Sequence, residues 1–205
     1  MTPRRPIIAD PVHLAELAGT ACLCVRPTGR VAEVHAQVQR RLRETVGEDR
    51  ASWPDAHMSL GGFGTPDRPV DSAIERKLVS VAEQWARETP PLRLDVEGVE
   101  VFSDDRIPIV RIRRTPTLGA VHKDVRERVE ASGLPGQDDI ALQDWAFHLS
   151  LVYYGGERWP EVEAAARNIS VPMATCVVGE SELVGFDGGF EQLLGRFPLL
   201  GRPLE

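Results

Sequence analysis

The sequence predicts one α+β domain made of two similar lobes, and three observations support this. Stretches with the apolar spacing of helices alternate with stretches whose apolar and polar residues alternate as in strands. The string His57-Met58-Ser59-Leu60 has a counterpart 91 residues later in His148-Leu149-Ser150-Leu151. No linker rich in Ser, Gly or Pro separates the halves, so we expect a single domain over residues 19–205, preceded by a loosely packed N-terminal extension over residues 1–18.

The first half is expected to follow the order strand, helix, strand, helix. Residues 20–25 form an apolar strand that Arg26-Pro27-Thr28-Gly29 ends. Three- and four-residue spacing of apolar side chains then predicts an amphipathic helix containing Val31, Val34, Val38, Leu42 and Val46. Residues 51–63 place the first motif on a strand. Helical spacing returns over residues 70–87, until Thr89-Pro90-Pro91 ends that helix.

The second half repeats the pattern with additional strands. Alternation over residues 92–97 predicts a half-buried strand, which residues 99–102 continue and a turn separates from a strand at 109–113. A helix at 117–131 and a polar loop at 133–139 precede the second motif strand. A short helix at 159–168, strands at 174–178 and 182–184, and a packed tail at 190–200 complete the chain.

The repeated motif indicates chemistry. Side chains two residues apart on a strand face the same side, so His57 shares a face with Ser59, and His148 shares one with Ser150. An imidazole titrates near neutrality, and a hydroxyl beside it can donate a hydrogen bond to an anionic oxygen. One such string arises easily by chance, so the duplication is the signal. It indicates one histidine as base and one as acid across a shared phosphate.

Composition limits the partners. The net charge is −7, with two lysines and 22 arginines, which argues against long nucleic acid as the main partner and allows a small anionic substrate. No secretory segment or membrane-length apolar run is visible, so we expect a cytoplasmic protein that does not bind membranes. Three cysteines are an odd number. For Cys22 and Cys24 we favour core packing over a metal or redox role, since no second matched pair exists.

On these motifs the chain resembles the two-histidine phosphoesterase superfamily, the 2′-5′ RNA ligase and cyclic phosphodiesterase group. The resemblance covers nearly the whole chain after residue 18 and includes Gly98-Val99-Glu100-Val101-Phe102 and Glu180-Ser181-Glu182-Leu183. It implies two pseudo-symmetric lobes of antiparallel sheet around a central cleft, with helices outside. It also implies hydrolysis or transfer at a 2′,3′-cyclic or 2′-5′ phosphodiester, with neither metal nor cofactor.

The resemblance also implies residue roles. One of His57 and His148 deprotonates the attacking water and the other protonates the leaving ribose oxygen, and which does which stays open. Ser59 and Ser150 hold the phosphate oxygens. Many bacterial members carry an arginine five residues after the second histidine, where this chain has Tyr153.

Tyr153 and Tyr154 are the only tyrosines, and we expect them to contact substrate by stacking on a base or donating to phosphate. Packing against the neighbouring lobe is an equal alternative. Arg111 and Arg113 share a strand face, where solvated surface arginines are favoured over a role in cleft charge. His13, His35 and His122, expected in the extension or on helix surfaces, receive no role.

The sequence therefore predicts a monomeric, metal-independent phosphodiesterase that acts on a 2′,3′-cyclic nucleotide or a cyclic phosphate at an RNA end. Two alternatives stay open. One is a 2′-5′ RNA ligase that acts on RNA halves, and the other is a non-catalytic nucleotide-binding module of the same fold.

Overall fold

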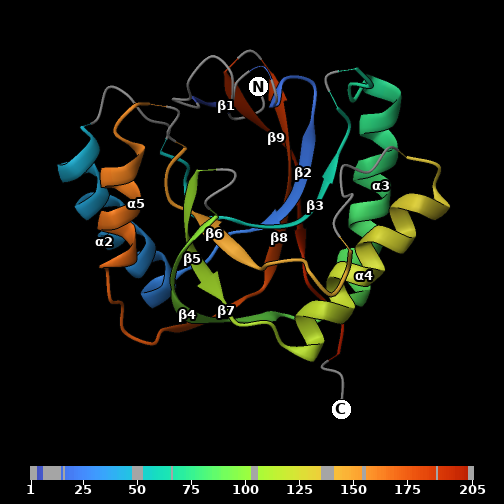
Figure 1. Cartoon of the computed structure of the whole chain (residues 1–205). Coiled ribbons are helices and arrows are strands. Elements are labelled where there is room, and N and C mark those ends of the chain that lie inside the picture. The colour runs from blue at the N-terminus through green and yellow to red at the C-terminus, as the bar shows by residue number, and fades with distance from the viewer. Residues whose placement is uncertain are drawn as a thin grey trace.

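Two antiparallel sheets form the centre of the molecule (Figure 1). The computed structural model describes residues 4–6, 15, 17–47, 53–65, 67–102, 106–134, 141–153, 156–187 and 189–202. The first sheet has the order β1 (Arg4–Pro6), β9 (Phe190–Pro198), β8 (Glu180–Asp187), β2 (Ala21–Val25), β3 (Met58–Phe63). The second sheet has the order β6 (His148–Ser150), β5 (Ile107–Ile112), β4 (Leu92–Phe102), β7 (Thr175–Val178).

Two of the four helices that the structure describes pack on a different sheet from the one that contains the strand before them in the chain. The four helices are α2 (Gly29–Val46), α3 (Ser72–Glu88), α4 (Pro116–Ala131) and α5 (Trp159–Arg167). Helices α3 and α4 pack on the first sheet and α2 and α5 on the second, so the sheets lie between the two helix pairs (Figure 1). Yet α2 follows a strand of the first sheet, and α4 follows a strand of the second. Each lobe is therefore covered in part by a helix that comes from the other.

Local sequence sets the helix ends. The Asp71 carboxylate accepts hydrogen bonds from the amides of Ala73 and Ile74, which otherwise lack partners in the first turn of α3. Thr115 does the same for α4, and Pro116 suits its first turn because the missing N–H is not needed there. Gly47, with φ of 83°, ends α2 in a conformation that side chains disfavour.

Each sheet has a core face and a motif face, the latter being the face that bears the motif serine. In the first sheet Leu23, Met58 and Leu60 are buried in the core. Cys24 pairs in register with Ser59 on the opposite, motif face. Strands β3 and β6 are edge strands of their sheets, and they contact each other. The fold thus brings the two motif strands together.

The predicted α+β, two-lobed fold is confirmed, with three differences in detail. Strand β3 begins at Met58, so His57 lies directly before the strand. Residues 190–198, expected as a packed tail, form β9, because a hairpin at Gly189 turns them back onto β8. Leu194 is an extra residue in this strand, between Leu193, which pairs with Val184, and Gly195, which pairs with Leu183, and it breaks the alternation that would have revealed the strand. Residues 4–6, within the predicted extension, form β1, which pairs with β9.

Candidate active site

The two motif histidines are held in the same way. His57 Nδ1 lies 2.9 Å from the carbonyl oxygen of Asp55, and His148 Nδ1 lies 2.8 Å from that of Ala146. A carbonyl oxygen only accepts, so Nδ1 is the protonated nitrogen that donates in each ring. In the neutral imidazole Nε2 is then the basic nitrogen. Both rings therefore present the same nitrogen for proton transfer.

Each motif serine forms a hydrogen bond with another side chain of the site. The Cys22 thiol donates to Ser59 Oγ at 3.3 Å, and the side chains of Ser150 and Tyr153 are hydrogen bonded. Burial raises the pKa of Tyr153, so its hydroxyl stays protonated at neutral pH. Cys22 of the first lobe lies near enough to Tyr153 to raise its pKa further. The two motifs thus approach each other through this thiol and this phenol.

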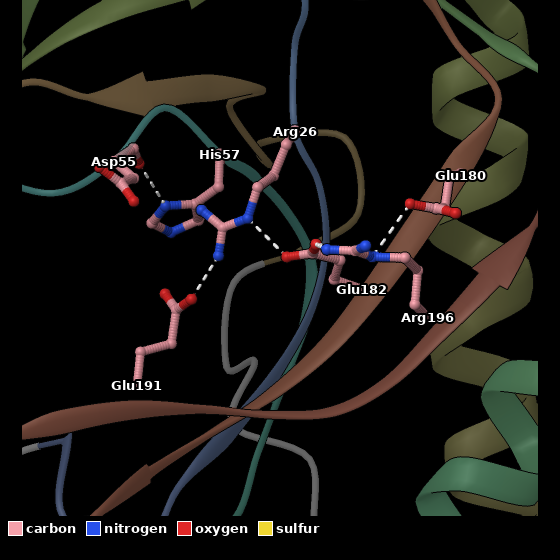
Figure 2. Close-up of polar contacts among 7 residues, drawn as sticks. All are labelled: Arg26, Asp55, His57, Glu180, Glu182, Glu191 and Arg196. Atoms are coloured by element: carbon pink, nitrogen blue, oxygen red, sulfur yellow. Dashed lines mark hydrogen bonds and ion pairs between the residues drawn. The ribbon is translucent and has the colours of Figure 1, made fainter. Parts of the chain in front are cut away.

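A network of charged side chains lies beside His57 (Figure 2). Arg26 donates through Nε to Glu182 Oε2 at 2.5 Å, and through Nη2 to Glu191. The other oxygen of Glu182 accepts from Arg196 Nη2 at 2.6 Å. Arg26 and Glu182 are nearly buried, with 18% and 7% of their side chains exposed. This part of the site is a cluster of closely paired charges whose central members are nearly buried.

The environment of His57 favours its neutral form. Burial lowers the pKa of His57, and the positive charge of Arg26 acts in the same direction. The bond to the Asp55 carbonyl and the charges of Asp55 and Glu182 oppose this shift without overcoming it. A histidine that stays neutral at neutral pH is suited to accept a proton.

His148 has different neighbours. The ring of Phe102 meets its ring edge to face, with centroids 5.1 Å apart. Arg111 lies directly across from His148 in the pairing of β5 with β6. Arg111 has 27% of its side chain exposed, and its Nη1 is 3.8 Å from Glu100 Oε2. His148 therefore lies between an aromatic ring, that of Phe102, and an arginine, Arg111, whose ion pair with Glu100 is long.

His35 and His122, expected on helix surfaces without a role, are buried and correct that expectation. His35 on α2 donates through Nε2 to the Ser150 carbonyl at 2.9 Å, and His122 on α4 donates through Nδ1 to the Leu60 carbonyl at 2.8 Å. Each binds a carbonyl of a motif strand, and each lies on a helix that crosses to the other lobe. In the sequence, each of these histidines stands among the apolar residues of a helix, which is a signal that its side chain is buried. The carbonyl that accepts its hydrogen bond lies far away in the sequence, so the bond itself could not be predicted.

Other predicted residues have mixed outcomes. Arg113 has 53% of its side chain exposed, as the favoured surface prediction has it, and pairs with Glu97 at 3.9 Å. Cys22 and Cys24 are both buried, as predicted, although they pack with Val184 in a small apolar cluster on the motif face of the first sheet, apart from the main core. Tyr154 and His13 lie outside the described residues.

Two negative findings apply to the part of the chain that the structure describes. No group of three or more His, Cys, Asp or Glu side chains there is placed to hold a metal ion. None of its helices has the length and apolar character needed to cross a membrane.

Comparison with known proteins agrees with this architecture. Residues 27–189 match the family model of the 2′-5′ RNA ligase superfamily. LigT of E. coli, crystallised with 3′-AMP, superimposes with a TM-score of 0.63 at 16% identity, over 88% of this chain and 98% of that one. TT0787 of Thermus thermophilus gives 0.62 at 19% identity, over 90% and 100%. No curated protein matches the chain in sequence.

Proposed function

Because the chain belongs to the 2′-5′ RNA ligase superfamily, and so to the two-histidine phosphoesterases, we propose that it is a metal-independent phosphodiesterase. The proposed substrate is a 2′,3′-cyclic nucleotide or the cyclic phosphate at an RNA end. One observation supports this above all: both motif histidines donate from Nδ1 to the carbonyl two residues earlier. This duplicated geometry leaves two equivalent basic nitrogens, as a reaction with one base and one acid requires.

The proposed reaction is hydrolysis by two proton transfers. Nε2 of one histidine removes a proton from water, and the water oxygen attacks phosphorus. The bond from phosphorus to one ribose oxygen breaks, and the other histidine, protonated at the start, gives its proton to that oxygen. The product is a nucleoside monophosphate, and solvent restores the two protonation states. Ser59 and Ser150 donate to the non-bridging oxygens as negative charge develops there.

Charge supports a small substrate. A chain with net charge −7 and two lysines lacks the basic surface that repeated phosphate contacts need. LigT crystals contain 3′-AMP, ATP or NADP⁺, all of them small nucleotides. In our proposal Tyr153 and Tyr154 contact the substrate, and the bond between Tyr153 and Ser150 favours a phosphate contact for Tyr153.

The test is turnover of 2′,3′-cyclic mononucleotides in the presence of EDTA, with the product isomer identified by chromatography. We expect hydrolysis at an undiminished rate, since side chains supply the acid, the base and the phosphate contacts. Loss of turnover on chelation, with recovery on adding zinc or manganese, would overturn the metal-independent mechanism. Binding without turnover would favour the non-catalytic module.

A parallel titration separates this function from RNA ligation. We expect tRNA to bind weakly, with little change between two salt concentrations, because few phosphates are contacted. Tight and strongly salt-dependent tRNA binding, together with joining of RNA halves, would favour the 2′-5′ RNA ligase.

A further inference from the structure

The duplication extends beyond the histidines and serines to the next strand of each sheet. In the second sheet Arg111 on β5 pairs in register with His148 on β6. In the first sheet Val25 pairs with Met58, so the next positions outward place Arg26 opposite His57. Residues opposite each other on antiparallel strands face the same side, with Cβ atoms about 5 Å apart. Each motif histidine therefore has an arginine as its cross-strand neighbour.

A glutamate on the third strand completes the pattern. Glu182 on β8 pairs with Cys24, two residues before Arg26, and forms an ion pair with Arg26. Glu100 on β4 pairs with Ile109, two residues before Arg111, and forms an ion pair with Arg111.

The motif serines occupy the same rows as these glutamates. Ser59 pairs with Cys24, and Ser150 pairs with Ile109. Both motif faces thus bear the same four residue types at matched register positions.

The two arginines differ in how firmly they are held. Arg26 is bound by two carboxylates, and its remaining Nη1 is buried without a hydrogen-bond partner in the part of the chain that the structure describes. Arg111 has one ion pair among the described residues, at 3.8 Å, which is beyond hydrogen-bond distance. Its partner Glu100 has 52% of its side chain exposed, so breaking that contact costs little. Arg111 is therefore the guanidinium that can turn toward an anion on the motif face.

We propose that Arg111 binds the phosphate of the nucleotide substrate, exchanging its contact with Glu100 for one with a phosphate oxygen. This inference rests on the proposed function, whose two serines supply only neutral donors. A guanidinium matches the geometry of two phosphate oxygens and keeps its charge at any working pH. Placed opposite His148, Arg111 meets the phosphate beside a histidine that, in the proposed reaction, transfers a proton at either the attacking water or the leaving ribose oxygen.

Binding and turnover of adenosine nucleotides test the proposal. We expect Arg111→Gln to raise the KM for adenosine 2′,3′-cyclic monophosphate and the Kd for adenosine 3′-monophosphate about tenfold or more, as for a lost charge-assisted hydrogen bond. The Kd for adenosine, which lacks the phosphate, should not change. Arg111→Lys should lose less nucleotide affinity than Arg111→Gln, because lysine keeps the positive charge but lacks the paired N–H donors that bind two phosphate oxygens at once.

Two control variants separate a direct contact from a general charge effect and from a structural ion pair. Arg113→Gln removes the same charge at an exposed position two residues further along the chain. An equal loss of nucleotide affinity in this variant would show that only the overall positive charge matters, and it would overturn the direct contact with Arg111. Glu100→Gln breaks the same ion pair but frees Arg111, so affinity should stay the same or rise. A loss equal to that of Arg111→Gln would show a structural ion pair and overturn the inference.

Binding and turnover together separate this proposal from the proposed function. Nucleotide binding that depends on Arg111, without hydrolysis by the unaltered protein, would contradict only the proposed reaction. Hydrolysis with an unchanged KM in Arg111→Gln would contradict only the role of Arg111. Absence of nucleotide binding by the unaltered protein would contradict both.

Discussion

The two lobes bear the same residue types on their motif faces but hold them differently. In the first lobe Arg26, Glu182, Glu191 and Arg196 form a network whose central members are nearly buried. In the second, Arg111 and Glu100 form a wider and more exposed ion pair. Burial decides how fixed a charge is, because a desolvated ion depends on its partner and a solvated one does not. Symmetry of residue types therefore coexists with asymmetry of the environment.

The largest expected effect concerns the motif histidines. We expect His57→Ala and His148→Ala each to lower kcat for a 2′,3′-cyclic mononucleotide by at least ~100-fold, because each lobe supplies one proton transfer in the proposed reaction. The kcat/KM of the unaltered protein should show a bell-shaped pH profile, since one imidazole must be neutral and the other charged. Steady-state kinetics from about pH 5 to 9 measure both, with circular dichroism as the folding control. An effect confined to one histidine would mean that the lobes do not share the chemistry.

The matched glutamates should differ in their contribution to stability. Glu182→Gln leaves the nearly buried Arg26 with Glu191 as its remaining carboxylate and the half-exposed Arg196 facing a neutral amide, so we expect the free energy of unfolding to fall by about 2 kcal/mol. Glu100→Gln removes an exposed partner and should change it by less than about 1 kcal/mol. Urea unfolding of the two variants gives the comparison directly. Equal losses would show that the two ion pairs are held alike.

His35 and His122, which lie on the helices that cross to the other lobe, should make the free energy of unfolding depend on pH. Burial lowers the pKa of His35 and of His122, so the unfolded chain binds protons that the folded chain excludes. Their contribution is complete above the unfolded pKa of about 6.5 and is lost as pH falls below it, by up to about 1.4 kcal/mol per pH unit for each histidine.

Glutamine at these positions tests the assignment. His35→Gln and His122→Gln keep an N–H donor for the motif-strand carbonyl but cannot be protonated, so each should flatten the fall of stability between about pH 6.5 and 5. Unfolding curves at several pH values provide the measurement. An unchanged slope in both variants would assign the acid sensitivity to other groups.

The smallest expected effects concern the partners of the motif serines. Tyr153→Phe removes the bond between Tyr153 and Ser150, and we expect a roughly two- to tenfold rise in KM for the cyclic nucleotide. Cys22→Ala removes a weaker thiol donor from Ser59 and should change KM by no more than about threefold. If Cys22→Ala raised KM more than Tyr153→Phe does, the serine of the first lobe, and not that of the second, would depend more on its hydrogen-bond partner for substrate binding.

Residues close in sequence were predictable, and those joined by long-range pairing were not. The spacing of Val31, Val34 and Val38 predicted α2, and the alternation within the two His-x-Ser strings predicted the strands β3 and β6, because helix and strand periods are local properties. The crossing of α2 to the second sheet has no local signal, so His35 could not be connected with Ser150. Arg26 was assigned only to a turn after a strand, since its place opposite His57 depends on the register between β2 and β3.

The exchange of helices between the sheets has a consequence for how the molecule opens. The first sheet takes strands from both ends of the chain and α4 from its middle, while the second sheet is covered by α2 from the first half. Neither lobe is one continuous segment, so melting one exposes the apolar face of the other and removes a buried histidine anchor from its motif strand. The amides of β3 and β6 should therefore exchange with solvent through one shared opening event. A population with one motif histidine in place and the other disordered is thereby suppressed, and the protein gains or loses the placement of His57 and His148 together.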